Sequence, residues 1–213
     1  MALIKDTTGR KEKETASGYE RVFGNRLLGM LISKVHATSI RQGTELEGFL
    51  ASKLPQNTEI AIAKINKDER VFKNAKTDST GKKHRLEIDC VIKTKDKIML
   101  IEIKDGDTFD TKKVAGEVES LNFARNYISK IMKIPKDKIS MYYCSFNARD
   151  SKQINAGAKG LLGECEAMTG REFCKLIGLD FDKIVQERKK DEKENLNYFV
   201  EELKKIPEIR EKI

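Results

Sequence analysis

The pattern of apolar and polar positions along this chain predicts alternating helices and strands. Apolar residues recur at helical spacing along residues 19–35 and again along residues 111–132. A further helix is predicted over residues 44–54, where Thr44 and Glu47 have the spacing of a capping box. Four segments have the short apolar or alternating pattern of strands: residues 58–65, 85–92, 98–104 and 139–146. The predicted order is helix, three strands, helix, strand.

The remaining segments have weaker patterns. Residues 1–17 are polar and aperiodic, which predicts an arm or a short cap. Residues 147–163 contain glycine and basic residues and are interpreted as a DNA-facing loop. Thr169 is placed to cap a short helix that Gly178 ends, and one or two charged helices follow to the C-terminus. We therefore expect an arm at 1–17, a core at 18–150 and a mainly helical extension at 151–213, in one compact domain.

The predicted hairpin at residues 85–104 places charged groups where a strand usually buries apolar ones. The alternation of a strand puts Asp89 on the face opposite Leu86 and Ile88. It puts Glu102 and Lys104 together on one face of the second strand. The run I-M-L-I-E-I-K is too apolar for an exposed edge, which argues against a hairpin whose charges merely face water. Two carboxylates and an ammonium group can therefore converge.

Such a convergence has a chemical use. Mg2+ prefers oxygen ligands, and one or two carboxylates with waters and substrate phosphates often hold it. Asp89 and Glu102 would bind Mg2+, with Mn2+ able to substitute, and Lys104 would lie beside the metal to orient a water and offset charge on a phosphate.

The spacing D-x12-E-x-K resembles the active-site signature of the PD-(D/E)XK nuclease superfamily, with Asp89, Glu102 and Lys104 on its positions. Ile88 stands where that signature has its name-giving proline. The segment R-Q-G-T-E-L-E is similar to a motif in the first core helix of many such enzymes. This resemblance implies that Glu47 adds a further acid to the metal site, with Glu45 as the substitute. The capping box is the alternative role of Glu47.

The resemblance implies an α/β fold, a central mixed β-sheet of the αβββαβ restriction-endonuclease-like core flanked by helices, with a helical C-terminal extension. It implies a Mg2+-dependent endonuclease that hydrolyses double-stranded DNA at a short specific sequence, most like a type II restriction endonuclease and expected to act as a homodimer. A structure-specific nuclease, such as a Holliday junction resolvase or a repair enzyme, is the first alternative. A non-catalytic nucleic-acid-binding module is the second.

The distribution of charge fits a nucleic-acid partner. The net charge is +8 over 213 residues. Residues 64–85 carry eight basic residues against three acids and residues 111–160 carry ten against four, whereas residues 86–110 carry four against seven. Acids would hold the cation and the flanking basic residues would hold phosphates. Five candidates for DNA contact follow from their positions: Lys83, Lys112, Lys113, Arg149 and Lys152. A soluble, Lys- and Glu-rich surface is the plainer account of the same charges.

Other chemistry and locations have less support. Lys112 and Lys113 lie in the first turn of a predicted helix, where the helix dipole disfavours cations, so we expect an anion nearby. The four cysteines form no C-x-x-C pair and His36 and His84 are far from them in sequence, which favours free buried thiols over a zinc site. No apolar run approaches the roughly 18 residues of a membrane span, and the N-terminus lacks a signal-peptide pattern. A cytoplasmic protein without membrane contact is expected.

Overall fold

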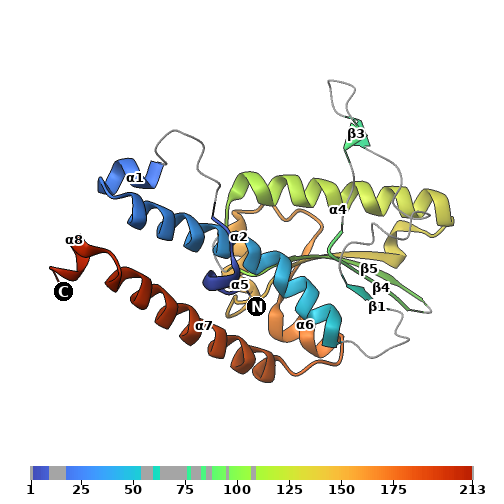
Figure 1. The fold of residues 1–213 in the computed structure, drawn as a ribbon. Coiled ribbons are helices and arrows are strands. Elements are labelled where there is room, and N and C mark those ends of the chain that lie inside the picture. The colour runs from blue at the N-terminus through green and yellow to red at the C-terminus, as the bar shows by residue number, and fades with distance from the viewer. Residues whose placement is uncertain are drawn as a thin grey trace. The chain divides into compact units, whose positions relative to one another are not determined.

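A computed structural model of the chain describes residues 2–9, 18–53, 60–62, 76–77, 83–84, 88–94, 96–106 and 109–212 (Figure 1). The elements in chain order are η1 (Ile4–Asp6), α1 (Gly18–Phe23), α2 (Arg26–Lys53), β1 (Ile60–Ile62), β2 (Lys76–Thr77), β3 (Lys83–His84), β4 (Cys90–Lys93), β5 (Ile98–Lys104), α4 (Thr111–Met132), η3 (Lys136–Lys138), β6 (Ile139–Ser145), α5 (Ser151–Ala158), β7 (Glu166–Thr169), α6 (Gly170–Leu176), α7 (Phe181–Lys204) and α8 (Pro207–Arg210). Arg85 and Leu86 of the predicted first hairpin strand lie outside the described residues.

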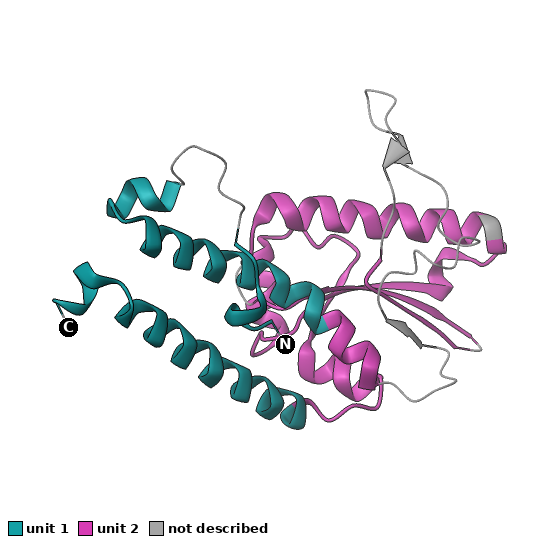
Figure 2. Ribbon diagram, in the orientation of Figure 1, with its two compact units in different colours: residues 1–46, 182–213 teal, residues 47–181 magenta. Residues whose placement is uncertain are grey.

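The chain divides into two compact units, which Figure 2 colours separately. Unit 1 comprises residues 1–46 and 182–213, and unit 2 comprises residues 47–181. The sheet and the D-x12-E-x-K residues belong to unit 2. The boundaries of these units differ from those of the expected arm, core and extension. The expected division stays a prediction.

Unit 2 is built on a five-stranded sheet with the order β1-β4-β5-β6-β7. The pairs β1/β4 and β4/β5 are antiparallel, whereas β5/β6 and β6/β7 are parallel. The predicted hairpin is confirmed, because Cys90 pairs with Ile101 and Lys93 with Ile98. The connection from β5 to β6 passes through α4, as a parallel pair requires. The mixed sheet with the αβββαβ order is thus confirmed, and β7 extends it.

Helix α4 has the predicted bounds and covers one face of the sheet (Figure 1). The apolar stripe of α4 is buried in one cluster with residues of strands β5 and β6. The stripe consists of Val114, Val118, Leu121, Ala124 and Ile128. Burying a side chain of this size contributes about 1.5–3 kcal/mol relative to exposure. The helix begins after Asp110, whose carboxylate accepts the backbone N–H groups of Lys112 and Lys113 at 3.1 and 3.4 Å. Asp110 therefore supplies an anion at this N-terminus.

The segment after β6 differs from its prediction. Residues 151–158 form α5 and not a loop, because Asp150 caps the helix by accepting Gln153 N–H at 2.8 Å. Ile154 and Ala158, one helical turn apart, are both buried. Strand β7, which the sequence did not signal, follows α5. The predicted cap at Thr169 is confirmed as a capping box with Glu172.

The prediction of two separate helices over residues 19–35 and 44–54, with a capping box between them, was wrong. Helix α2 runs without a break from Arg26 to Lys53, so Thr44 lies inside a helix and does not cap one. The polar residues before Thr44 continue the backbone hydrogen bonding of the helix, which outweighs the local turn signal. Helix α1 forms the start of the predicted 19–35 helix and ends at Phe23, directly before Gly24, whose φ is +62°.

Residues 2–9 form the short cap that was one of the two alternatives for the N-terminus. Ile4 N–H donates to Asn195 Oδ1 at 2.7 Å, and Asn195 Nδ2 donates to the carbonyl of Ala2 at 3.0 Å. Lys5 pairs with Glu194 at 2.5 Å. This cap therefore belongs with α7 in unit 1. Within the described part of the chain, none of the helices has the length and apolar character needed to span a membrane.

Candidate active site

Asp89 and Glu102 meet across the β4–β5 hairpin. The register pairs Cys90 with Ile101, so one step further along the hairpin Asp89 lies across from Glu102. Asp89 Oδ2 accepts the backbone N–H of Ile103 at 2.8 Å. This hydrogen bond holds the carboxylate of Asp89 against β5, next to Glu102. The two acids that the sequence singled out are therefore adjacent.

Lys104 lies on the same face of β5 as Glu102, as the strand period predicts. Its Nζ is 2.7 Å from Glu102 Oε1. The Glu102 side chain is 10% exposed and the Lys104 side chain is 35% exposed. The pair is thus mostly shielded from water, with the ammonium group nearer to the surface.

Two further residues join this cluster that the sequence did not single out. Glu117 of α4 places Oε1 at 2.9 Å from Lys104 Nζ. Tyr143 of β6, the register partner of Glu102, donates its hydroxyl to Glu117 Oε2 at 3.2 Å. The ammonium group of Lys104 therefore lies between two carboxylates, and one of these is held by a tyrosine.

Burial and neighbouring charges perturb the protonation of the cluster. Burial, and then the charges of Asp89 and Glu117, raise the pKa of Glu102 to about 8, and Lys104 opposes this shift. Burial lowers the pKa of Lys104, but the carboxylates of Glu102 and Glu117 outweigh it and hold this pKa above its usual value. Burial also raises the pKa of Tyr143. The cluster thus keeps Lys104 protonated and gives Glu102 an affinity for a further positive charge.

The donors at this position suit a hard divalent cation. Carboxylate oxygens of Asp89 and Glu102 are ligands that Mg2+ accepts, and Mg2+ completes its coordination with waters and phosphate oxygens. Among the described residues no group of three or more His, Cys, Asp and Glu side chains has the arrangement of a metal site. The β4–β5 hairpin therefore offers two carboxylates to a cation, and waters and phosphates would fill the remaining positions.

The two acids of α2 that the sequence offered for the metal site, Glu47 and Glu45, belong to different units. Glu47 is half-buried on α2 and belongs to unit 2, like the hairpin acids. Its predicted part in metal binding stays a prediction. Glu45, the substitute, belongs to unit 1 and forms an ion pair with Arg41 at 3.1 Å.

Four of the five predicted DNA-contacting residues follow the carboxyl ends of the parallel strands β5 and β6. Lys112 and Lys113 are exposed at the start of α4, and Arg149 and Lys152 are exposed at the start of α5. Carboxyl ends of parallel strands lie at one edge of a sheet, and Lys104 is the last residue of β5. The side chain of the fifth, Lys83 in β3, is outside the described residues.

Hydrogen bonds join the connections that carry these cations. Ser145 Oγ donates to the carbonyl of Gly106 at 2.6 Å, and Asn147 Nδ2 donates to Asp105 Oδ1 at 3.1 Å. The connections after β5 and β6 are therefore held together beside Lys104. Arg149 also pairs with Asp150 at 3.1 Å, although its side chain is 84% exposed.

The four cysteines are buried free thiols, as expected: Cys90, Cys144, Cys165 and Cys174. Burial raises the pKa of each thiol, to about 11 for Cys165 and about 12 for Cys174. A thiol with a raised pKa is a poor nucleophile and a poor metal ligand at neutral pH. These residues contribute to packing.

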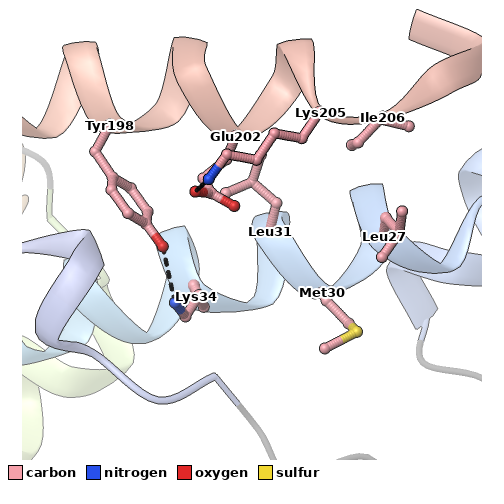
Figure 3. A pocket seen from close by; sticks show the side chains of 8 residues that line it. All are labelled: Leu27, Met30, Leu31, Lys34, Tyr198, Glu202, Lys205 and Ile206. Atoms are coloured by element: carbon pink, nitrogen blue, oxygen red, sulfur yellow. Dashed lines mark hydrogen bonds and ion pairs between the residues drawn. The ribbon is translucent and has the colours of Figure 1, made fainter.

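A recess of about 280 Å3 lies in unit 1, between α2 and α7 (Figure 3). Its apolar side comes mainly from α2, through residues such as Leu27 and Met30. Lys34 Nζ donates to Tyr198 OH at 3.0 Å, and Lys205 pairs with Glu202 at 2.5 Å. The polar groups of the recess are thus paired with one another, and we assign it no part in the chemistry of Asp89 and Glu102.

Comparison with known proteins gives one full-length match. No protein-family model matches the chain. The chain is 36% identical, over an alignment of 229 residues, to the type II restriction enzyme HhaII of Haemophilus parahaemolyticus. The alignment covers 100% of this chain and 98% of that enzyme. The similarity therefore extends over both units.

Proposed function

The chain belongs to the type II restriction enzymes, and from this premise we propose that Asp89, Glu102 and Lys104 form a Mg2+-dependent centre that hydrolyses phosphodiester bonds in double-stranded DNA. Membership of the family makes the protein a site-specific endonuclease. The observation that carries the proposal is the ammonium group of Lys104 at 2.7 Å from Glu102, with Asp89 across the hairpin. This arrangement supports assignment to the PD-(D/E)XK nucleases.

The residues of the centre have distinct roles in the proposed reaction. Asp89 and Glu102 bind the cation, and Glu47 assists them. A bound Mg2+ supplies positive charge that offsets the negative charge developing on the phosphate. Lys104 orients the attacking water in line with the leaving oxygen and donates hydrogen bonds to the charged phosphate. The hydrogen bond from Ile103 N–H keeps Asp89 in place throughout.

The DNA is held by cations at the same edge of the sheet. Lys112, Lys113, Arg149 and Lys152 are exposed there and carry charge that phosphates can neutralise. We assign them to backbone contact, and Lys83 to the same task from β3. Backbone contacts of this kind fix the position of the duplex without selecting its sequence.

A second copy of the chain is the proposed partner in cleavage. Each chain contributes one centre of this kind from its described residues, and a duplex has two strands to cut. A two-fold symmetric dimer would present one centre to each strand of a symmetric site. The corner of α1 and α2 offers an apolar contact surface, because Val22 is 74% exposed, Phe23 52% and Leu27 53%.

The test is cleavage of phage DNA and of a four-way junction, each with Mg2+ and with EDTA, followed on gels. We expect discrete fragments from phage DNA with Mg2+ and intact DNA with EDTA. Lys104→Ala should bind the cognate DNA normally and lose cleavage, whereas Lys97→Ala, an exposed lysine of the same hairpin, should cleave like the wild type.

Other outcomes would reject parts of the proposal. Cleavage in EDTA would exclude the metal requirement. Cleavage of the junction alone would indicate a structure-specific nuclease. Wild-type cleavage by Lys104→Ala would remove Lys104 from the centre.

A further inference from the structure

The ammonium group of Lys104 has two carboxylate partners where the D-x12-E-x-K pattern supplies one. Glu102 lies at 2.7 Å and Glu117 at 2.9 Å from Lys104 Nζ. Glu117 comes from α4, and its side chain is 20% exposed. Its second oxygen accepts the hydroxyl of Tyr143 at 3.2 Å. A chain of hydrogen bonds thus runs from β6 through α4 to Lys104 on β5.

Under the proposed function, the carboxylate of Glu102 takes part in two interactions. It holds the cation and it also pairs with Lys104. Any share of its charge directed to a divalent cation weakens its attraction for the ammonium group. A lysine side chain has a flexible four-carbon stem. An ammonium group whose ion pair is weakened therefore loses its fixed position. A second carboxylate removes this conflict.

The position of Glu117 is itself fixed by packing. It lies on α4 between Val114 and Val118, both of which are buried against the sheet. The hydrogen bond from Tyr143 then sets the orientation of its carboxylate. One of its oxygens pairs with Lys104 and the other accepts the Tyr143 hydroxyl, so we assign Glu117 to Lys104 and not to the metal.

We propose that Glu117 is a positioning residue that holds the ammonium group of Lys104 in its working place, and that Tyr143 orients Glu117. This inference rests on the proposed function of Lys104. Glu117 touches neither the cation nor the DNA in this scheme and acts through Lys104. Its removal should therefore slow the chemical step without weakening the binding of DNA.

The experiment measures the single-turnover cleavage rate and the DNA dissociation constant for a set of variants. Glu117→Ala should lower the rate about 10- to 100-fold, in the range seen when groups that orient a metal-site residue are lost. Its dissociation constant for DNA, measured in EDTA, should equal that of the wild type. Glu117→Gln keeps an acceptor for Lys104 and should recover part of the rate, and Tyr143→Phe should give a smaller loss than Glu117→Ala. Glu119→Gln, an exposed residue of the same helix, serves as the matched control.

Two readouts separate positioning from a structural role and from failure of the proposed function. The folded fraction of each variant, from thermal unfolding, must stay unchanged at the assay temperature, so that a lower rate reports Lys104 and not lost protein. The second readout is the dissociation constant for DNA in EDTA, which Glu117→Ala should leave at the wild-type value because Glu117 acts only through Lys104. A wild-type rate for Glu117→Ala while Lys104→Ala is inactive would overturn this inference alone. A wild-type rate for Lys104→Ala would overturn the proposed function as well.

Discussion

Glu102 places a carboxyl group at a position of β5 where its neighbours in the strand are apolar. The residue is 7% exposed, between Ile101 and Ile103, which are 0% and 4% exposed. A buried carboxylate costs folding free energy, and here a second acid, Asp89, adds to the cost. Under the proposed function the same features would favour a bound cation. Glu102 is therefore expected to reduce the stability of the metal-free protein in exchange for function.

The replacement Glu102→Gln tests this cost. The pKa of Glu102 is raised to about 8 in the folded state from 4.5, so the folded state binds more protons between these values. The contribution of Glu102 to the free energy of unfolding is therefore fully present below its pKa in the unfolded state. It is lost as the pH rises through its pKa in the folded state. As the pH rises from 5 to 8, the unfolding free energy of Glu102→Gln relative to that of the wild type should increase by on the order of 2–4 kcal/mol. Urea unfolding without divalent cations at the two pH values measures it.

The control for this prediction is Glu119→Gln, because Glu119 is exposed on α4. It shows how a change of Glu to Gln affects urea unfolding at the two pH values outside the cluster. A pH-independent difference between Glu102→Gln and the wild type would show that Glu102 ionises like an ordinary glutamate in the folded state.

The sequence predicted the residues of the site that lie on one hairpin and missed those that come from elsewhere. Asp89, Glu102 and Lys104 follow from the two-residue period of strands. Glu117 and Tyr143 join them through tertiary packing of α4 and β6, which no local pattern reports. One signal was available for Glu117, because it falls within the apolar stripe of α4, where a charged residue requires a partner.

At the scale of elements, the predictions were right where a periodic apolar pattern extends over the whole element. They were wrong where capping-box or glycine signals were given more weight than that pattern. Helix α4 and strands β4, β5 and β6 were found because each has a continuous apolar pattern. The break assigned at Thr44 was wrong, because capping-box spacing also occurs inside continuous helices. Helix α5 was missed since its glycine content suggested a loop, although Asp150 provided an N-cap. Strand β7 has four residues, too few for a period to register.

Two helical glycines give opposite predictions for the same substitution. A Cβ atom at Gly157 of α5 would overlap the ring of Phe109, whereas at Gly116 of α4 it would meet nothing within 4 Å. Gly157→Ala should lower the free energy of unfolding by about 1–3 kcal/mol, because the ring must move from the core. Gly116→Ala should raise it by about 0.5–1 kcal/mol through helix propensity alone.

Each glycine variant is the control for the other in urea unfolding at fixed pH. Equal shifts in the two variants would mean that α5 does not pack on Phe109. A rise in stability for Gly157→Ala would lead to the same conclusion.

At the scale of the whole molecule, charge should guide the binding of DNA. Under the proposed function the acids of residues 86–110 would hold the cation, while basic residues lie on the connections after β5 and β6. Removing Lys112 and Lys113 together by alanine should weaken binding to any DNA sequence. It should also lower the slope of log K against log salt by about 2, since each lost phosphate contact contributes about 0.9. Fluorescence anisotropy over a range of salt concentrations in EDTA provides the slope.

The matched control is the pair Lys189 and Lys190, adjacent and exposed on α7. Alanines there should leave the salt slope unchanged. Equal reductions for both pairs would indicate a diffuse attraction to DNA and no defined contact at the start of α4.

Assembly is the last property that belongs to the whole molecule. Two centres in a symmetric dimer would cut both strands of a symmetric site in one binding event, and the exposed apolar residues at the α1–α2 corner, such as Val22, offer a surface for that contact. We expect light scattering to give twice the 24.3 kDa of one chain. Val22→Asp should shift this mass toward one chain and turn double-strand cleavage into nicking, because a charge in an apolar interface is left without a partner. Ile40→Asp, at a residue that is 67% exposed, should leave the dimer intact. A one-chain mass for the wild type on its cognate DNA would contradict the dimer, and a dimer unaffected by Val22→Asp would place its interface away from this corner.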